Sequence, residues 1–252
     1  MKVFLTGASS GIGEALARHY ALQGATLGLV ARRGDLLEEL KARLGTPCEA
    51  YACDVRDAGA MNDAAARFMA RHGTPDVVIA NAGISVGNLT EFAEDLEVFR
   101  EILEINVLGL AATFHPFLAP MRARGSGSLA GIASVAGLRG LPGATAYSAS
   151  KAAAIRYLEG LRVELRGSGV CVTTIVPGYI ETAMTRRNPY PMPFMLPAEE
   201  AARRFARAIA AGRSYAIIPW QMAIVGRILG VLPDWVFDRF AVKAGRKPRR
   251  GA

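Results

Sequence analysis

Apolar strand-like runs alternate with helical patterns through residues 1–180 of this 252-residue chain, and this alternation limits the possible folds more than any other feature. The strand-like runs are 3–6, 26–31, 49–52, 77–80, 127–133 and 169–176, and the helical patterns between them are 13–22, 36–44, 58–71, 96–121 and 149–165. Nearly continuous apolar strands that alternate with helices are typical of a parallel sheet covered on both faces. We therefore predict an α/β fold in which a doubly wound parallel sheet forms a single domain over 1–252.

Composition excludes several classes of protein. The three cysteines form no CxxC pair and only three histidines are present, so we expect neither a disulfide framework nor a metal site, and we predict a cytoplasmic protein. The first predicted strand begins at once, which leaves no room for a cleavable leader. The net charge is +8, but five of the positive charges lie in residues 243–252, which contain no acidic residue. We interpret this segment as a solvated basic tail and expect no nucleic-acid partner.

A glycine-rich turn follows the first predicted strand and opens the first predicted helix, with the sequence Thr6-Gly7-Ala8-Ser9-Ser10-Gly11-Ile12-Gly13. Glycine allows a tight turn and a close approach of the backbone to a pyrophosphate, and a helix N-terminus supplies unpaired N–H groups. In this context the turn predicts a dinucleotide site. Its expected contacts are Gly7, Ser9, Ser10, Gly11, Ile12 and Gly13. The alternative is an ordinary turn between a strand and a helix.

The end of the second strand indicates which dinucleotide binds. An acidic residue there would bond a ribose 2′-hydroxyl, but the strand ends in Arg32 and Arg33. A guanidinium pairs with a 2′-phosphate through charge-assisted hydrogen bonds, so we predict NADP(H) rather than NAD(H). The alternative for the two arginines is surface solubility. Asp35 and Glu38 fit a capping box, and we interpret Asp35 as the N-terminal cap of helix 36–44.

Two further loops follow predicted strands. Asp54 and Val55 come after the third strand, and Asn81, Ala82 and Gly83 come after the fourth. The carboxyl ends of parallel strands meet at one edge of a sheet, so these loops should lie beside the glycine-rich turn and contact the adenosine and ribose of the cofactor. In isolation, either loop would be an ordinary turn.

Ser134, Tyr147 and Lys151 indicate the chemistry. A free tyrosine, with a pKa near 10, is a poor base at neutral pH. A lysine ammonium and the positive nicotinamide ring of an oxidised cofactor would stabilise the phenolate and lower that pKa. A spacing of four puts Tyr147 and Lys151 on one face of a helix, and Ser134 ends the fifth strand, where its hydroxyl can bond the substrate oxygen. Alone, each has an ordinary alternative, because Tyr-x-x-x-Lys is common on helices and a serine can simply end a strand.

Together and in this order, these residues resemble the short-chain dehydrogenase/reductase family in its compact, NADP(H)-preferring branch, which has a Rossmann fold. The resemblance covers residues 1 to about 182 and also includes Asn106 and Pro177-Gly178. It implies that Asn106 holds a water bonded to Lys151 and completes a proton relay from Tyr147. By itself, Asn106 would be interpreted as a polar residue that kinks the long helix. The implied catalytic set is Asn106, Ser134, Tyr147 and Lys151.

The resemblance also assigns cofactor contacts. It implies that Lys151 binds the ribose together with Tyr147, that Thr182 contacts the nicotinamide carboxamide, and that Arg32 meets the 2′-phosphate. The same segment contributes Pro177, Gly178 and Ile180 to the expected cofactor site. Members of the family commonly form dimers or tetramers, so we expect a homodimer or homotetramer.

The pattern after residue 182 is less regular. Residues 183–197 contain three methionines, two aromatic residues and four prolines, which predicts a loop, and a helix at 198–211 follows. We predict that residues 183–213 comprise a lid, 183–197, and the helix after it, and that the lid covers the substrate pocket, which in such sheets lies at the carboxyl edge. Four side chains would suit an apolar substrate: Met184, Met192, Phe194 and Met195. The alternative is a proline-rich surface loop.

Residues 214–252 are expected to hold a short strand at 214–219, an apolar segment at 220–232 and the basic tail. The apolar segment is too short to span a bilayer. Three interpretations stay open for it: a helix packed on the pocket or on a neighbouring subunit, a contact in the plane of a membrane surface aided by the basic tail, or simple core.

The sequence thus predicts an enzyme that interconverts a carbonyl and a secondary alcohol on a small or medium hydrophobic substrate. Hydride transfer would belong to the nicotinamide, with Tyr147 as general acid or base. One alternative is a non-catalytic NADP(H)-sensing protein that keeps the fold without turnover. Another is a reductase of lipid-like ketones that associates with a membrane surface through its C-terminal tail.

Overall fold

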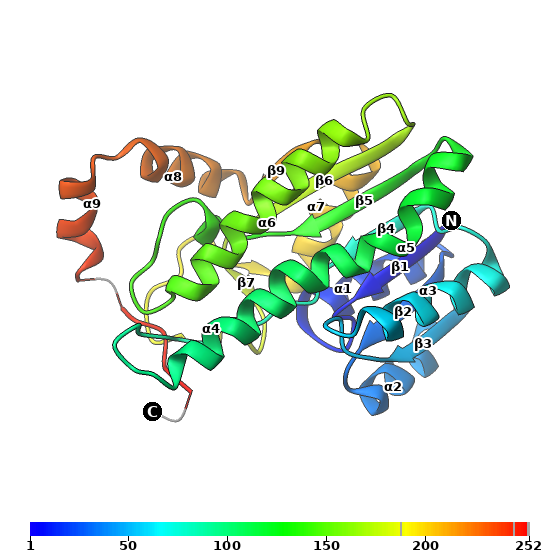
Figure 1. The fold of residues 1–252 in the computed structure, drawn as a ribbon, viewed down its shortest axis with the longest axis horizontal. Coiled ribbons are helices and arrows are strands. Elements are labelled where there is room, and N and C mark those ends of the chain that lie inside the picture. The colour runs from blue at the N-terminus through cyan, green and yellow to red at the C-terminus, as the bar shows by residue number, and fades with distance from the viewer. Residues whose placement is uncertain (187, 244, 251–252) are drawn as a thin grey trace.

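The fold is built on one seven-stranded parallel sheet in the computed structural model, which describes residues 1–186, 188–243 and 245–250 (Figure 1). The strand order is β3-β2-β1-β4-β5-β6-β9, and every neighbouring pair is parallel. The strands are β1 (Lys2–Thr6), β2 (Thr26–Ala31), β3 (Cys48–Ala52), β4 (Val77–Ala80), β5 (Gly127–Ile132), β6 (Val170–Pro177) and β9 (Tyr215–Ile218). The winding reverses between β1 and β4, which is the place where sheets of this kind bind ligands beyond the carboxyl ends of their strands.

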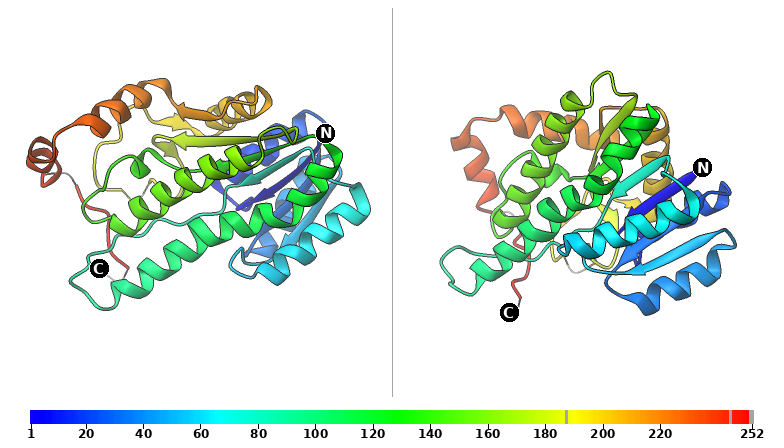
Figure 2. Two further views of the ribbon diagram at one scale, coloured as in Figure 1. Left: turned by 45° about the horizontal axis from the view of Figure 1, so that its top comes forward. Right: turned by 45° about the vertical axis from the view of Figure 1, so that its right-hand side comes forward.

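Successive residues of β1 point to opposite faces of the sheet and join two separate cores. The helices are α1 (Gly11–Leu22), α2 (Gly34–Leu44), α3 (Ala58–His72), α4 (Asp95–Leu103), α5 (Gly109–Arg124), α6 (Thr145–Glu164) and α7 (Ala198–Ala210). Val3 and Leu5 pack in a first core with α1, α2 and α7, whereas Phe4 packs in a second core with α3, α5 and α6. Figure 2 shows these helices on both faces of the sheet. The predicted α/β class and the doubly wound sheet are confirmed.

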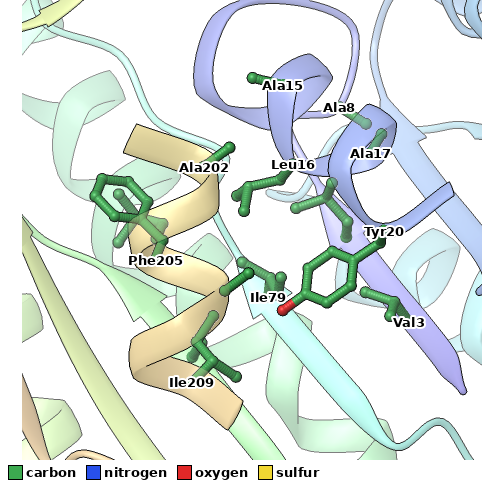
Figure 3. Close-up of a cluster of buried hydrophobic side chains, with 14 of the residues drawn as sticks. Val3, Ala8, Ala15, Leu16, Ala17, Tyr20, Ile79, Ala202, Phe205 and Ile209 are labelled. Carbon is green, nitrogen blue, oxygen red and sulfur yellow. The ribbon is translucent and has the colours of Figure 1, made fainter. Parts of the chain in front are cut away.

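Helices α1 and α7 pack against each other over the first core (Figure 3). Leu16 of α1 lies beside Ala202 of α7, and Ile79 of β4 lies between the two helices. Each large side chain buried in this way stabilises the fold by about 1.5–3 kcal/mol. Because α7 follows directly after residue 197, this packing holds the C-terminal end of the predicted lid against the sheet.

The long helix predicted at 96–121 consists of α4 and α5 joined by a π-helical turn, Glu104–Leu108. By length and composition, the continuous helix Asp95–Arg124 could cross a membrane, but this is weak support for a membrane span. Phe114 and Phe117 on α5 are fully buried in the second core, and α5 packs on α3 while α4 packs on α6. These contacts explain its apolar composition as that of a core helix.

The predicted cap of α2 is wrong. The helix begins at Gly34 with Arg33 in the N-cap position, so Asp35 lies inside the first turn. An acidic side chain in the first turn still interacts favourably with the helix dipole, which is the physical role left to Asp35. The capping-box pattern misled because it does not distinguish the cap from the first turn.

The segment after β6 forms structure that the sequence indicated only in part. Two short strands, β7 (Ile180–Glu181) and β8 (Leu196–Pro197), pair beside the main sheet and bracket the loop between them. The apolar segment is helix α8 (Trp220–Val231), and a further helix, α9 (Asp234–Ala241), follows it. One face of α8 packs on Leu138 and on the edge strand β9, because a Cβ on Gly226 would lie 2.5 Å from Leu138 Cδ1 and 3.9 Å from Ile217 Cδ1. The other face exposes apolar side chains, so a subunit or membrane contact there stays a prediction.

Candidate active site

The glycine-rich turn joins β1 to α1 in a conformation that depends on its glycines. Gly7 and Gly11 have φ angles of +69° and +57°, in the left-handed region that L side chains rarely adopt. A Cβ on Gly13 would lie 2.1 Å from the Gly7 carbonyl oxygen, so the turn closes on α1 only with glycine at that position. The N-terminus of α1 therefore opens at the carboxyl edge of the sheet, where its unpaired N–H groups can bind an anion.

The loop after β4 is fastened to this turn. Asn81 donates from its side-chain amide to the carbonyl oxygens of Thr6 (3.1 Å) and Gly7 (3.2 Å), and the Thr6 hydroxyl accepts from the backbone N–H of Asn81 (3.2 Å) and of Ala82 (3.3 Å). A Cβ on Gly7 would lie 2.8 Å from Ala82 Cα, so backbone packs directly on backbone. The predicted cofactor residues of the two loops thus form one surface.

Arg33 reaches across the glycine-rich turn. Its Nη2 donates to the hydroxyls of Ser9 (3.0 Å) and Ser10 (2.9 Å). Arg33 and Ser10 are exposed and Ser9 is half-buried, and together they gather a guanidinium and two hydroxyls at the end of β2, the position at which a dinucleotide carries its 2′-substituent. They form a donor set that suits a phosphate.

Arg32, the residue before Arg33, directs its guanidinium toward the loop after β3. Its Nη1 is 3.9 Å from Asp54 Oδ2, and Arg56, which sequence reasoning missed, donates to the same oxygen at 2.7 Å. Burial alone would raise the pKa of Asp54, but hydrogen bonds from Arg56 outweigh it and hold that pKa below its usual range. Asp54 is therefore ionised at neutral pH, while the neighbouring Val55 is buried in the second core.

Ser134 and Tyr147 meet at the carboxyl end of β5. The Ser134 hydroxyl accepts from the backbone N–H of Ala136 (3.2 Å), which opens a 3-10 turn, Val135–Gly137. Tyr147 lies in the first turn of α6. Burial raises the pKa of Tyr147, and a hydrogen bond with Ser134 partly offsets that rise. The phenol is thus protonated at neutral pH and beside the hydroxyl that was predicted to orient the substrate.

Lys151 lies one helical turn beyond Tyr147 and is buried. Its Nζ is 5.8 Å from the centre of the Tyr147 ring and donates to the Ile132 carbonyl oxygen at 2.8 Å. Burial lowers the pKa of Lys151 to about 8. An ammonium carries three N–H donors, so two are left for a ribose hydroxyl or a water.

Asn106 lies in the π-helical turn and is held by the loop after β4. Its amide nitrogen donates to the Ile84 carbonyl (3.0 Å) and to the Ser150 hydroxyl (2.9 Å), and its Oδ1 accepts from the Ile84 N–H (2.9 Å). A Cβ on Gly83 would lie 3.1 Å from Asn106 Oδ1 and 3.4 Å from Lys151 Nζ, so the asparagine and the lysine face the same small space. The four predicted catalytic residues are therefore gathered at one place.

The loop after β6 covers the glycine-rich turn. A Cβ on Gly11 would lie 3.1 Å from Thr182 Cγ2, which brings Thr182 opposite the N-terminus of α1. Ile180 is buried in β7, and Gly178 packs against α8, where its Cβ would lie 2.6 Å from Met222 Cγ. Together with Pro177 at the end of β6, these residues complete the carboxyl edge at which the predicted cofactor residues lie.

The apolar side chains predicted to line the pocket divide into two groups. Met192 is half-buried and accepts from the Asn188 side-chain amide. Phe194 and Met195 are exposed and line an outer groove against α7 and Trp220, away from Tyr147. Met184 is exposed as well. That these four side chains line an apolar substrate pocket stays a prediction.

The interpretation of the basic tail as solvated is wrong for Lys247, Arg249 and Arg250, whereas Lys243 and Arg246 are exposed as expected. We call 245–250 the C-terminal strap, because it returns from α9 and crosses the loops before α4 and before α6 (Figure 1). The Gly87 N–H donates to the Pro248 carbonyl (3.1 Å), and Arg249 pairs with the buried Asp95 at 2.8 Å. Arg250 also pairs with Glu101 on α4. Residues 244, 251 and 252 of the predicted tail lie outside the described residues.

The comparison with known proteins agrees with this geometry. A family model described as short chain dehydrogenase matches residues 1–191. The chain belongs to the short-chain dehydrogenase family. Its relatives there are oxidoreductases, so the chain is an oxidoreductase of that family. Members of the short-chain dehydrogenase family use nicotinamide cofactors, act on small molecules and often form oligomers.

Three short-chain dehydrogenase relatives show how far the similarity extends. The chain is 39% identical over 240 residues to an uncharacterised oxidoreductase of Myxococcus xanthus, with 94% of each chain covered. It is similar to the crystal structure of a short-chain dehydrogenase from Streptomyces avermitilis, with a TM-score of 0.81, 27% identity, and coverage of 96% of this chain and 98% of that one. It is also similar to the closed form of serine dehydrogenase complexed with NADP+, with a TM-score of 0.77, 25% identity and coverage of 86% and 94%.

Lys151→Met should stabilise the protein without cofactor at pH 7 and abolish turnover. A lysine pKa of about 8 in the folded state means that the charged form costs roughly 3 kcal/mol relative to an ordinary lysine. The cost is full below about pH 8 and fades as the pH rises toward the ordinary lysine pKa near 10.4, where the unfolded chain also loses its proton. The melting-temperature gain of Lys151→Met over wild type should therefore be largest near pH 7 and shrink by pH 10. A gain of the same size in Lys243→Met, at an exposed position, would contradict this account.

Arg249→Met should release the C-terminal strap and speed trypsin cleavage at the basic residues before it by several-fold. Arg249 is the strap residue that joins the buried Asp95, and its hydrogen bond holds the pKa of Asp95 below the usual range near 4. The ion pair is therefore complete above about pH 4 and is lost only as the pH falls through that lowered value. Mass spectrometry of the released C-terminal peptide measures the rate. Arg239→Met on α9 is the matched control, and equal rates in the two variants would show that the pair does not hold the strap.

Proposed function

We propose that this oxidoreductase uses NADP(H) to interconvert a carbonyl and a secondary alcohol on a small or medium hydrophobic substrate. The observation on which the proposal depends is the position of Tyr147, beside Ser134 and one turn from the buried Lys151. All three lie at the sheet edge that also holds the glycine-rich turn. Family membership supports the reaction class, because members transfer hydride between nicotinamide and a small molecule.

In the proposed reaction, the side chains of the site orient the substrate oxygen and transfer a proton to it. In reduction, the Tyr147 hydroxyl donates its proton to the substrate oxygen, and the Ser134 hydroxyl bonds that oxygen from the other side. Lys151 stabilises the phenolate left behind, and Asn106 supports a proton path from Lys151 to solvent. When bound, NADPH supplies the hydride that reduces the carbonyl carbon.

The glycine-rich turn fits a dinucleotide, because side chains at Gly7 and Gly13 would collide with backbone where the turn must stay open. The preference for the 2′-phosphate is supported by Arg33 with Ser9 and Ser10, and by Arg32 beside them. The serine dehydrogenase to which the chain is similar was solved with NADP+, which agrees with this preference. Asp54, Val55, Asn81, Ala82, Gly83, Pro177, Gly178, Ile180 and Thr182 complete the proposed cofactor site.

The test is absorbance of reduced nicotinamide while the protein meets hydrophobic ketones and aldehydes, with NADPH and NADH in parallel. Turnover with NADPH at low cofactor concentration, and weaker turnover with NADH, is the expected result. Tight NADPH binding without turnover of any carbonyl or alcohol would favour a cofactor-sensing protein. Equal use of both cofactors would overturn the NADP(H) assignment.

Two further expectations concern location and assembly. The three cysteines are free, with Cys48 and Cys53 partly buried, which suits a reducing cytoplasm. The helices that cover the second core carry exposed apolar side chains, including Leu108 at the end of the π-helical turn and Val163 on α6. A homodimer or homotetramer that buries these side chains is expected, and sedimentation analysis measures it.

A further inference from the structure

The C-terminal strap brings a second ammonium to Tyr147. Lys247 Nζ lies 5.8 Å from the centre of the Tyr147 ring, the same distance as Lys151 Nζ. It donates to the hydroxyl of Ser85, in the loop after β4, at 2.7 Å. Two ammonium groups, one from α6 and one from the strap, therefore lie beside the ring of Tyr147.

The backbone of the strap is fixed on both sides of Lys247. On one side, a Cβ on Gly245 would lie 2.6 Å from Tyr190 Cβ, so the strap touches the predicted lid. On the other side, Pro248 accepts from the Gly87 N–H and Arg249 is paired with Asp95. The strap thus bridges the lid and the loop after β4, and its lysine reaches the Ser85 hydroxyl in that loop.

Two of the four basic side chains of the strap form ion pairs with other described residues; of the remaining two, Arg246 is exposed and Lys247 is partly buried. Arg249 and Arg250 pair with acidic side chains around α4. Lys247 has the neutral Ser85 as its hydrogen-bond partner and pairs with no acidic side chain among residues 1–186, 188–243 and 245–250. Burial lowers the pKa of Lys247 to about 8, so the ammonium is still mostly protonated at pH 7. A half-buried cation without an anion is costly, and a bound anion would relieve that cost.

We propose that Lys247 is a substrate-binding residue that pairs with a carboxylate, so that the preferred substrates are oxo acids and their hydroxy acid counterparts. This inference rests on the proposed function. A single ammonium beside one hydroxyl suits a carboxylate with a single charge, whereas recognition of a phosphate usually needs several donors. The carboxylate takes no part in the bond changes, which stay those of carbonyl reduction at Tyr147. A preferred substrate would then hold its carbonyl at Tyr147 and its carboxylate at Lys247, which lies beside the Tyr147 ring.

The experiment compares 2-, 3- and 4-oxo acids of four to eight carbons, each with its methyl ester, at saturating NADPH. Wild type should show kcat/KM at least 10-fold higher for the best acid than for its ester. Lys247→Met should lower kcat/KM for that acid about 10- to 100-fold, mainly through KM, and change the ester value less than threefold. Lys247→Arg should restore most of the loss, and Lys243→Met, an exposed lysine near the strap, should behave as wild type.

Binding is measured separately, so that failure of the reaction and failure of the pairing are distinguishable. In the Tyr147→Phe background with NADPH, the melting temperature should rise with the oxo acid and not with its ester, and this rise should vanish when Lys247→Met is added. No turnover by wild type, with this acid-dependent rise intact, would overturn the proposed function alone. Equal effects of acid and ester on wild type, or equal losses for both in Lys247→Met, would overturn the assignment of Lys247.

Discussion

Tyr147→Phe should lower kcat for NADPH-dependent carbonyl reduction by about 10²- to 10⁴-fold, the usual contribution of a general acid or base. Phenylalanine keeps the ring that packs near Lys151 but removes the hydroxyl that reaches Ser134. The KM for NADPH should change far less than kcat, because the variant loses only the expected ribose contact of the Tyr147 hydroxyl, while the proposed phosphate contacts lie elsewhere on the sheet edge. Loss of reduced-nicotinamide absorbance in single-turnover and steady-state experiments measures both parameters.

The direction of the pKa shift adds a second expectation for Tyr147. Because burial raises this pKa, the protonated phenol should support reduction across neutral pH, whereas alcohol oxidation, which needs the phenolate, should speed up as the pH rises. Tyr157→Phe is the matched control, since Tyr157 lies on the same helix and packs on the second core. A Tyr147→Phe enzyme that keeps more than a tenth of wild-type kcat would rule out the assigned role.

Replacing Arg32 and Arg33 together with alanine should reverse the cofactor preference. Each charge-assisted hydrogen bond to a phosphate contributes about 1.5–3 kcal/mol, and each 1.4 kcal/mol changes an affinity about tenfold. The double variant should therefore raise the Kd for NADPH by about 100-fold or more and leave that for NADH within threefold. Fluorescence titration with each cofactor measures this difference without any need for a substrate.

The single variants Arg32→Ala and Arg33→Ala distinguish the contribution of each arginine to NADPH binding. The family resemblance assigns the 2′-phosphate to Arg32, whereas the hydrogen bonds of Arg33 with Ser9 and Ser10 place that guanidinium over the glycine-rich turn. We expect Arg33→Ala to cause the larger loss, since Arg32 is already close to Asp54. Arg43→Ala, at the far end of α2, should change neither affinity. Equal losses for NADPH and NADH in the double variant would show that these arginines do not bind the 2′-phosphate.

The sheet and the candidate catalytic site could be predicted because local patterns specify them. Apolar runs such as 77–80 have the length and composition of buried strands, and parallel topology then brings Ser134 and the glycine-rich turn to one edge. The π-helical turn could not be predicted in the same way, because the apolar pattern of 96–121 continues through it. The one sign of the turn in the sequence is Asn106, a polar residue within the apolar pattern. In the structure its side-chain amide forms hydrogen bonds with the backbone of Ile84.

The C-terminal strap was mispredicted for a different reason. Its arginines have no acidic neighbours in sequence, and a run of that kind is usually solvated. Their partners, Asp95 and Glu101, lie about 150 residues earlier, and only the tertiary fold brings them together. A pairing of acidic and basic segments across that separation has no periodicity for a single sequence to show. Lys247 was overlooked for the same reason.

The π-helical turn at Glu104–Leu108 changes the direction in which the side chains after it point. A turn with one extra residue rotates every following side chain by about 100° relative to an unbroken α-helix. The apolar stripe of α4 can therefore face α6 while that of α5 faces α3, although the two form one rod. A single-residue deletion within 104–108 would remove this rotation. If α4 then stayed packed on α6, the apolar side chains of α5 would turn away from α3, and if α5 stayed packed on α3, those of α4 would turn away from α6. An insertion or deletion there is thus a change of packing partner as much as a change of length.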